Sequence, residues 1–435
     1  MHITDRILFA FLALLVLAGC TPVAQNRTST EPCLFDHSDD PVDCAPDHTS
    51  ADKKAVTNSI EEHTEYALGF VEFDDQGWFY QPGQLKAVMD LLNREVEEQN
   101  LGIFVFVHGW KHSAKGDDMN VDEFRRILKR VRESAGASER VVGIYVGWRG
   151  LSATVEPFKE ASFWDRKFTA DHVAKGSARE IFARLRQFAG ERNQRQPGRV
   201  RIVAMGHSFG ALVLYHAVSQ SLVEAALRPG SVQHYFDLIV LINPAFEASR
   251  YEPVHHIAQC RTYPADQQPI LVSMTAENDW ATGTFFKLGR KLSTFLEAYN
   301  SKIESREEEA NHNTVGFVER YHTHSLYVGT VGAADQEEKG RAACAVPRAD
   351  ECVDLFDQDR RPASAARTNE DEQYPKNMVL RHEPRSNCDP YNPFWIVKTD
   401  KNVIDGHDDF YRPERTFIDF VLELLRRQAL RSGRR

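Results

Sequence analysis

Hydrophobic and polar residues follow two different periods along most of the chain. Short, nearly unbroken apolar runs are typical of strands covered on both faces, and they lie at 102–107, 141–146, 201–205, 238–242, 269–275 and 394–397. Helical spacing of apolar residues is found at 82–98, 121–134, 178–190, 211–218 and 416–425. A hairpin is expected over 67–80. Strands that alternate with helices predict an α/β fold with a mostly parallel, twisted sheet flanked by helices.

The first apolar run, Ile7 to Ala18, has a different character because Arg6 precedes it and Leu-Ala-Gly-Cys ends it at Cys20. At about 12 residues it is too short to span the hydrocarbon core as a helix, which favours a cleaved signal peptide. It resembles a bacterial lipoprotein signal with its lipobox. The resemblance implies a signal peptide over 1–19, an acylated Cys20 and attachment to a membrane surface. The alternative is an ordinary secretory signal with a chance cysteine.

The lipoprotein resemblance also concerns localisation and the segment that follows. Thr21, where some lipoproteins have aspartate, favours the outer membrane, facing the periplasm. Residues 20–62 are rich in Thr, Ser, Asp and Pro with little apolar periodicity, which predicts a flexible tether. No internal repeat is found, so we expect one folded domain over 63–435.

Composition narrows the class of protein. The chain is 42% hydrophobic and 27% charged, as in globular proteins, and its net charge of −10 argues against binding nucleic acid. With Cys20 acylated, six cysteines remain, which allow about 15 pairings in an oxidising compartment. Cys33 with Cys44 and Cys344 with Cys352 are spaced for local disulfides. No pair has the CxxC spacing of a metal or redox site.

The pentapeptide Gly206-His-Ser208-Phe-Gly210 lies between the apolar run 201–205 and the helical pattern 211–218. A serine on a strand-to-helix turn is held in a strained conformation, and Gly206 and Gly210 lack the Cβ atoms that would clash there. We expect Ser208 to be a nucleophile with an exposed hydroxyl. The alternative is a serine that only caps the following helix.

With this turn and the strand before it, the chain resembles the α/β-hydrolase superfamily over about 65–427. Within that superfamily, 106–112 and 142–150 resemble poorly characterised bacterial and fungal hydrolases. The resemblance implies an esterase or lipase-like serine hydrolase, without naming its substrate.

A serine hydroxyl needs a base and a carboxylate that stabilises the base. Asp279, in the loop after strand 269–275, is the expected acid, and Glu277 is its rival. His407, in the loop before the C-terminal helix, is the expected base, which gives the order Ser, acid, His of these enzymes. His322 and His324 are the alternatives. As a zinc site this His-x-His pair lacks a third ligand nearby, so neither a metal nor a cofactor is expected.

Backbone N–H groups aimed at the oxyanion stabilise it by about 3 kcal/mol per donor. By resemblance, Phe209 supplies one donor and Trp110 the other, while Gly109 lets the backbone turn inwards. Trp110 is also suited to wall the acyl pocket, or to pack only in the core.

The distance from Asp279 to His407 predicts a long insertion at about 300–390, preceded by a helix over 285–299 with a basic and an apolar face. Such an insertion is either a lid over the active site or a segment without a role in substrate choice.

Together these features predict hydrolysis of a carboxylic ester or thioester through an acyl-Ser208 intermediate, with a small-molecule or lipid ester as substrate and the membrane reached through Cys20. An amidase is a second possibility. Two other classes stay open: a non-catalytic envelope lipoprotein that binds a lipid, glycan or protein partner, and a cofactor-free peroxidase. The acyl-chain length and the oligomeric state are left open by the sequence.

Overall fold

The computed structural model describes residues 24–136, 139–151, 158–300, 303–330, 372–383, 389–412 and 414–432. The chain divides into two compact units, 1–200 and 201–435, where the sequence predicted one domain over 63–435. Within the described ranges, no helix combines the length and the apolar character that a membrane span requires. The predicted signal peptide and Cys20 lie outside the described residues.

The sheet of the first unit is mostly parallel at its centre. β6 pairs in parallel with both β4 and β5, whereas β3 pairs antiparallel with β4. Its strand order is β5 (Asn100–Val107), β6 (Glu139–Trp148), β4 (Tyr66–Phe73), β3 (Asn58–Glu62), β1 (Ser29–Phe35) and β2 (Pro41–Val42). The predicted hairpin is reduced to an isolated antiparallel bridge between Phe73 and Phe79.

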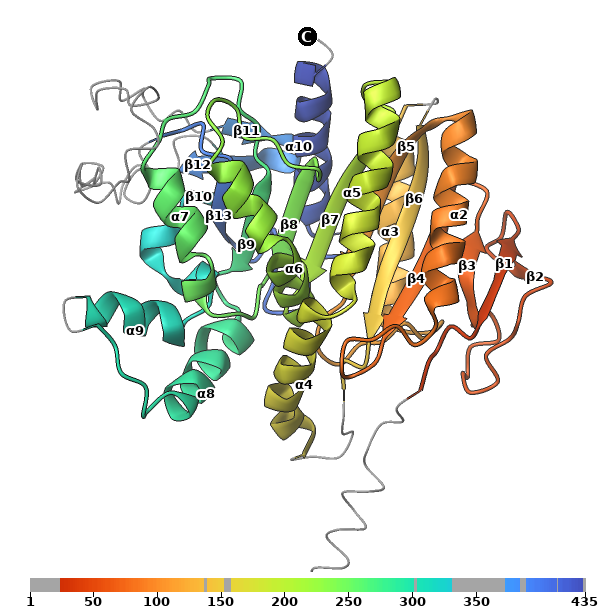
Figure 1. Cartoon of the computed structure of the whole chain (residues 1–435), viewed down its shortest axis with the longest axis horizontal. Helices are drawn as coiled ribbons and strands as arrows, with labels where there is room; N and C mark the ends of the chain where they lie inside the picture. Colours follow the sequence, from red (N-terminus) through yellow and green to blue (C-terminus); the bar gives the residue numbers. More distant parts are fainter. Residues whose placement is uncertain are drawn as a thin grey trace, which may run out of the picture. The chain divides into compact units, whose positions relative to one another are not determined.

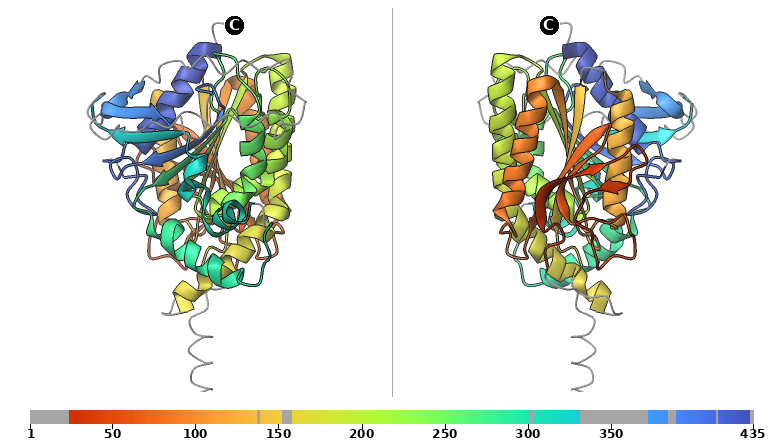
Figure 2. Two further views of the ribbon diagram at one scale, coloured as in Figure 1. Left: turned by 90° about the vertical axis from the view of Figure 1, so that its left-hand side faces the viewer. Right: turned by 90° about the vertical axis from the view of Figure 1, so that its right-hand side faces the viewer.

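Helices cover both faces of this sheet. They are α2 (Pro82–Glu98), α3 (Met119–Ser134) and α5 (Ala178–Arg195), whereas α4 (Phe158–Lys175) packs against α5. A Cβ on Gly69 would lie 2.6 Å from Val88 Cγ2 of α2, and a Cβ on Gly143, which pairs with Leu68, would collide with Leu128 of α3. Because neighbouring residues of a strand point to opposite faces, α2 and α3 lie on opposite sides of the sheet (Figure 2).

The tether predicted over 20–62 is wrong from residue 24 onwards. β1 pairs with β3 and β2, so this segment is part of the sheet. Arg27 has no exposed surface and donates to Glu61, which is equally buried, at 2.8 Å. Cys33 and Cys44 form the first of the two predicted local disulfides. This segment is therefore held to the sheet by strand pairing, a buried ion pair and a disulfide. None of these leaves a period in the order of apolar residues.

The second unit has a sheet whose central strands are parallel. β9 pairs in parallel with β8 and β13, and β8 with β7, as predicted from the apolar runs. The order is β11 (Glu372–Tyr374), β12 (Met378–His382), β10 (His324–Val328), β13 (Phe394–Thr399), β9 (Leu271–Ala276), β8 (Leu238–Ile242) and β7 (Val200–His207).

The helices of this unit are α6 (Phe209–Ala226), α7 (Glu252–Gln259), α8 (Phe286–Ser293), α9 (Glu304–His312) and α10 (Phe417–Ser432). Figure 1 shows α6 in front of β8 and α10 behind it. Shorter helical turns lie at Ala248–Arg250, Ala281–Phe285, Val315–Phe317, Glu319–Tyr321 and Pro375–Asn377.

The described parts of the predicted insertion extend this sheet. β10 pairs in parallel with β13 and antiparallel with β12, so the segment adds strands at the edge. The second predicted local disulfide, between Cys344 and Cys352, falls outside the described residues. Cys260 also takes part in a disulfide. The helix predicted over 285–299 is shorter than expected, since α8 ends at Ser293.

Candidate functional site

Ser208 occupies the turn between β7 and α6 with φ 55° and ψ −118°, a strained backbone conformation for a residue with a side chain. A Cβ on Gly206 would lie 2.7 Å from the carbonyl oxygen of Gly210 and 2.8 Å from Ala211 Cα. Only glycine therefore lets the strand and the helix approach so closely. The Ser208 side chain does not cap α6, which removes the capping alternative.

The Ser208 hydroxyl belongs instead to a chain of hydrogen bonds within the second unit. It donates to His407 Nε2 at 2.8 Å, and His407 Nδ1 donates to Asp279 Oδ2 at 2.9 Å. Asp279 is buried, whereas its rival Glu277 is exposed. The structure thus brings together the three residues that the sequence singled out, from the ends of β7 and β9 and the loop before α10.

Asp279 is held in its ionised form. Burial raises the pKa of this carboxyl group, but the charge of His407 and hydrogen bonds from His407 and Thr282 outweigh it, so that the net pKa is lowered. Ala281 N and Thr282 N donate to Asp279 Oδ1 at 2.9 and 3.2 Å, and the Thr282 hydroxyl donates to Oδ2. An ionised, fixed carboxylate is the partner that an imidazolium at His407 requires.

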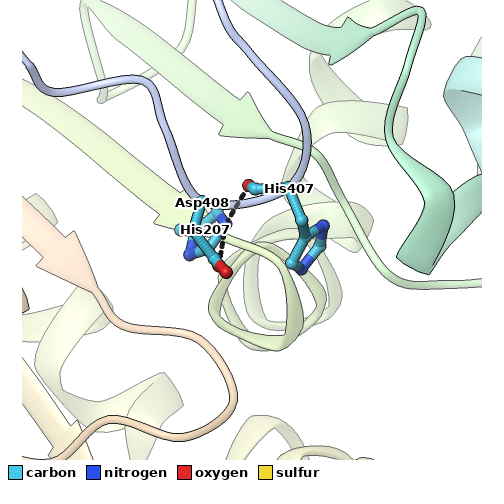
Figure 3. A group of neighbouring side chains, drawn as sticks. All are labelled: His207, His407 and Asp408. Carbon is cyan, nitrogen blue, oxygen red and sulfur yellow. Dashed lines mark hydrogen bonds and ion pairs between the residues drawn. The ribbon is translucent and has the colours of Figure 1, made fainter.

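Two buried side chains donate hydrogen bonds to the backbone of the loop that carries His407. Asn243 Nδ2 donates to the carbonyl oxygens of His407 at 2.7 Å and Gly406 at 3.0 Å. Its Oδ1 accepts from Ala276 N at 2.9 Å, which ties the loop to the end of β9. His207 Nε2 donates to the same His407 oxygen at 2.9 Å, as the dashed lines of Figure 3 show. We call Asn243 and His207 the carbonyl clamp.

Further polar contacts fix the flanks of this loop. Asn278 Oδ1 accepts from Gly406 N at 2.9 Å and its amide donates to Asp405 at 2.7 Å. Arg415 donates to Asp405 at 2.8 Å and to Asp409 at 2.6 Å. Asn243 follows the last residue of β8 directly. Its φ of 44° is the local signal that such a turn needs asparagine, but its partners at 406–407 are too distant along the chain to be found by pattern.

The expected exposure of the Ser208 hydroxyl is wrong, because Ser208 has no exposed surface. The turn does place the hydroxyl beyond the strand end, but His407 and the loop that carries it pack over it.

The loop predicted to hold the second oxyanion donor lies in the first unit. Trp110 is half-buried and meets the ring of Phe163 edge-to-face, with centroids 5.2 Å apart. Lys111 N donates to Gly150 O at 2.9 Å. Phe209, the other predicted donor, opens α6 in the second unit. The oxyanion role of both N–H groups stays a prediction.

His108 joins this loop to the end of β6. Its Nδ1 donates to Gly109 O at 2.9 Å, while its Nε2 accepts from Trp148 N at 3.0 Å. Burial lowers the pKa of His108 to about 4, so the ring is neutral at pH 7 and retains this donor and acceptor pattern. Its ring also stacks on Trp148 at an interplanar angle of 2°.

The two alternative histidines have other partners. His322 Nε2 donates to Gly316 O at 2.9 Å, and the His324 ring packs on Trp395 with centroids 4.4 Å apart. His407, and neither of these, is bonded to Ser208.

Among the residues that the structure describes, one group has ligand atoms close enough to hold an ion: His207, His407 and Asp408 (Figure 3). Both ring nitrogens of His407 already bond, one to Ser208 and one to Asp279. Coordination at His407 would break one of these two bonds.

Neither the protein-family models nor the curated proteins include a match to this sequence. Two solved structures are similar in part. Phospholipase PlaB from Legionella pneumophila is 10% identical, with 54% of this chain and 48% of that chain covered and a TM-score of 0.26. Trichoderma reesei cutinase in complex with a C11Y4 phosphonate inhibitor is 11% identical, with 37% and 63% covered and a TM-score of 0.17. At these TM-scores neither similarity bears on the fold or function of this chain.

Proposed function

We propose that this protein is a serine hydrolase with an α/β-hydrolase arrangement, which cleaves a carboxylic ester or thioester through an acyl-Ser208 intermediate. The observation that carries the proposal is the continuous hydrogen-bonded chain Ser208–His407–Asp279, with the serine on a strained turn. A serine that served packing or capping would need neither the strain nor the buried carboxylate.

In this mechanism His407 Nε2 takes the proton as Ser208 Oγ attacks the substrate carbonyl, and Asp279 stabilises the imidazolium that forms. The backbone N–H groups of Phe209 and Trp110 are proposed to stabilise the oxyanion. His407 then protonates the leaving alcohol or thiol. Water, deprotonated by the same nitrogen, attacks the acyl-enzyme and releases the acid, so that Ser208 regains its proton. None of these steps calls for a metal ion or an organic cofactor.

A fluorophosphonate probe tests the proposal directly, because it reacts only with an activated serine. The parent protein is expected to be labelled, and Ser208→Ala and His407→Ala to lose labelling. Ser219→Ala is the matched control, since that hydroxyl donates to His216 O within α6 and takes no part in the site. If the parent protein were not labelled, the proposed serine hydrolase activity would be contradicted, and a non-catalytic binding lipoprotein would be favoured. Labelling that survives in Ser208→Ala would place the nucleophile elsewhere.

We also propose that the protein is exported and anchored by a lipid on Cys20, at the outer membrane and facing the periplasm. The support is the lipobox-like sequence together with the Cys33–Cys44 disulfide, since disulfides persist in oxidising compartments. Mass spectrometry of the mature N-terminus is expected to find an acylated Cys20. An unmodified N-terminus at another residue would contradict the anchor.

A further inference from the structure

Large apolar side chains are exposed along the segment that begins directly after Asp279. We call this set the apolar strip. Its members and their exposed fractions are Trp280 (64%), Leu288 (59%), Leu292 (69%), Phe295 (77%) and Leu296 (84%). Exposed apolar side chains are normal when scattered, but a contiguous set marks a surface that another phase or partner covers.

The strip follows from the orientation of α8. Leu288 and Leu292 are four residues apart and share one face of α8, and Phe295 and Leu296 lie in the turn that follows the helix. Phe286 is fully buried on the side that packs against the unit. α8 therefore points its second apolar face outwards, which is the reverse of a helix that serves only the core.

Polar contacts hold α8 in this orientation. Arg290 donates to Asn311 O at 3.2 Å and to Asn311 Oδ1 at 2.7 Å, at the end of α9. The Thr294 hydroxyl donates to Arg290 O at 2.8 Å and bonds to His312 Nε2 at 2.9 Å. These bonds fix the side of α8 that faces the unit, so the opposite side stays exposed. Figure 1 shows α8 and α9 beside each other.

All charged side chains of α8 are basic. Lys287 and Lys291 are four residues apart and flank the apolar face, and α8 contains no acidic residue. Acidic residues lie nearby: Glu297 follows Leu296 and accepts from Asn311 Nδ2, and α9 carries Glu304, Glu307, Glu308 and Glu309. Glu307 accepts from Asn300 N, and Glu308 and Glu309 have partners in His312 and Arg320. Lysines beside an outward apolar face suit a lipid surface, because their stems lie along the acyl boundary while their amines meet the headgroup phosphates.

We infer that the apolar strip docks on a phospholipid bilayer that contains anionic lipid. The acyl boundary receives the apolar side chains, and the headgroup phosphates pair with Lys287 and Lys291. The strip begins one residue after the acid of the site, and Asp279 Oδ1 accepts from the first N–H groups of the same segment. Docking thus sets the site at the lipid surface. That last step, which makes a lipid ester the substrate, rests on the proposed function; the docking itself does not.

Vesicle flotation tests the docking with the chain from residue 21 onwards, which lacks both the apolar run at 7–18 and the predicted acylation site Cys20. The vesicles are phosphatidylcholine with phosphatidylglycerol. Leu288→Ser/Leu292→Ser/Phe295→Ser is expected to lower the partition coefficient at least about tenfold. The control, Leu34→Ser/Val42→Ser/Met119→Ser, removes three apolar side chains of the first unit that are 55%, 44% and 52% exposed, and it is expected to bind like the parent. Lys287→Gln/Lys291→Gln is expected to abolish the preference for anionic over neutral vesicles.

A second measurement does not depend on how the triple variant folds. Brominated phosphatidylcholine in the same vesicles is expected to quench a part of the tryptophan fluorescence that Trp280→Phe removes. Absence of this quenching, or unchanged partition of the strip variant, would overturn the inference. So would a dimer that the strip variant dissociates while vesicle binding persists, because a second copy would then cover the strip.

Membrane docking and hydrolysis at Ser208 can be tested independently of each other. Flotation and quenching use no substrate and are expected to be unchanged in Ser208→Ala. Hydrolysis of a short, water-soluble ester is expected to be unchanged in the strip variant, whereas hydrolysis of the same ester group in a vesicle lipid falls with binding. An inactive protein that still floats through the strip would sink the proposed function alone.

Discussion

The carbonyl oxygen of His407 accepts two hydrogen bonds from buried side chains, Asn243 and His207. Asn243 bonds to backbone groups alone, and the His207 ring lies against the His407 ring with centroids 5.0 Å apart. Both fix the backbone from which the imidazole extends, and Asn243 does so while it joins that backbone to the end of β9. At the scale of single residues, Asn243 and His207 therefore help to fix the position of His407 through its backbone.

Asn243→Ala is expected to lower kcat about tenfold to hundredfold, because small displacements of a catalytic group cost this much in rate. KM for a small soluble ester should change little, since the clamp does not touch the substrate. Steady-state kinetics and the rate of fluorophosphonate labelling measure the effect. Asn93→Ala is the control, because that exposed amide of α2 donates to Met89 O and accepts from Arg192, away from His407. A fully active Asn243→Ala would show that the loop holds His407 without the clamp.

Asp279→Asn is expected to lower kcat about 10³- to 10⁴-fold at neutral pH. The lowered pKa of Asp279 means that its charge is present throughout the neutral range, and an amide cannot supply it. Glu277→Gln is the matched control and should keep the parent rate, since Glu277 is exposed. If Glu277→Gln lost activity and Asp279→Asn did not, the rival acid would be the functional one.

At the scale of elements, periodicity located most of the sheet and its helices. α2 and β8 begin and end where the apolar pattern predicted. β1 to β3 were taken for a tether because their stability depends on polar contacts: Glu72 accepts from Asn26 N and Arg27 N, and Arg27 pairs with Glu61. Such partners are dozens of residues apart and leave no period in the sequence.

Arg27→Ala is expected to lower the free energy of unfolding by about 3–5 kcal/mol. Buried Glu61 then keeps Arg125 as its one arginine partner, and three carbonyl oxygens lose the donor that Arg27 supplies. Denaturant unfolding followed by circular dichroism measures it. Lys86→Ala, which breaks an ion pair whose side chains are 77% and 61% exposed, is the control and should change stability by about 0.5 kcal/mol or less. An equally small loss for Arg27→Ala would mean that the segment from 24 to 35 docks without its ion pair.

At the scale of the whole molecule, neutral histidines are buried in both units. Burial lowers the pKa of His108 and of His255 to about 4, below the ordinary value of 6.5. The folded protein resists protonation at these rings, whereas the unfolded chain does not. Their contribution to stability is complete above pH 6.5 and is lost as the pH falls towards 4.

Acidification from pH 7 to pH 4.5 is therefore expected to lower the melting temperature steeply, with each such histidine accounting for up to about 3 kcal/mol. Thermal unfolding across this range measures the slope. His255→Gln should make the slope shallower, while His172→Gln, an exposed control, should leave it unchanged. A melting temperature independent of pH over this window would contradict the assignment of neutral, buried rings.

The sequence by itself determined what local periods and short motifs encode: the α/β class, the order of most strands and helices, and the glycine-bracketed turn with a strained serine. Only the tertiary structure decided which side chains meet. In the folded chain Asp279 is buried and bonded to His407, whereas Glu277 is exposed. His407 lies 199 residues from its partner Ser208, and the carbonyl clamp and the Arg27–Glu61 pair also join distant segments. The physical reason is that a period records which face of an element is buried, whereas hydrogen bonds and ion pairs depend on distances between segments that no local pattern contains.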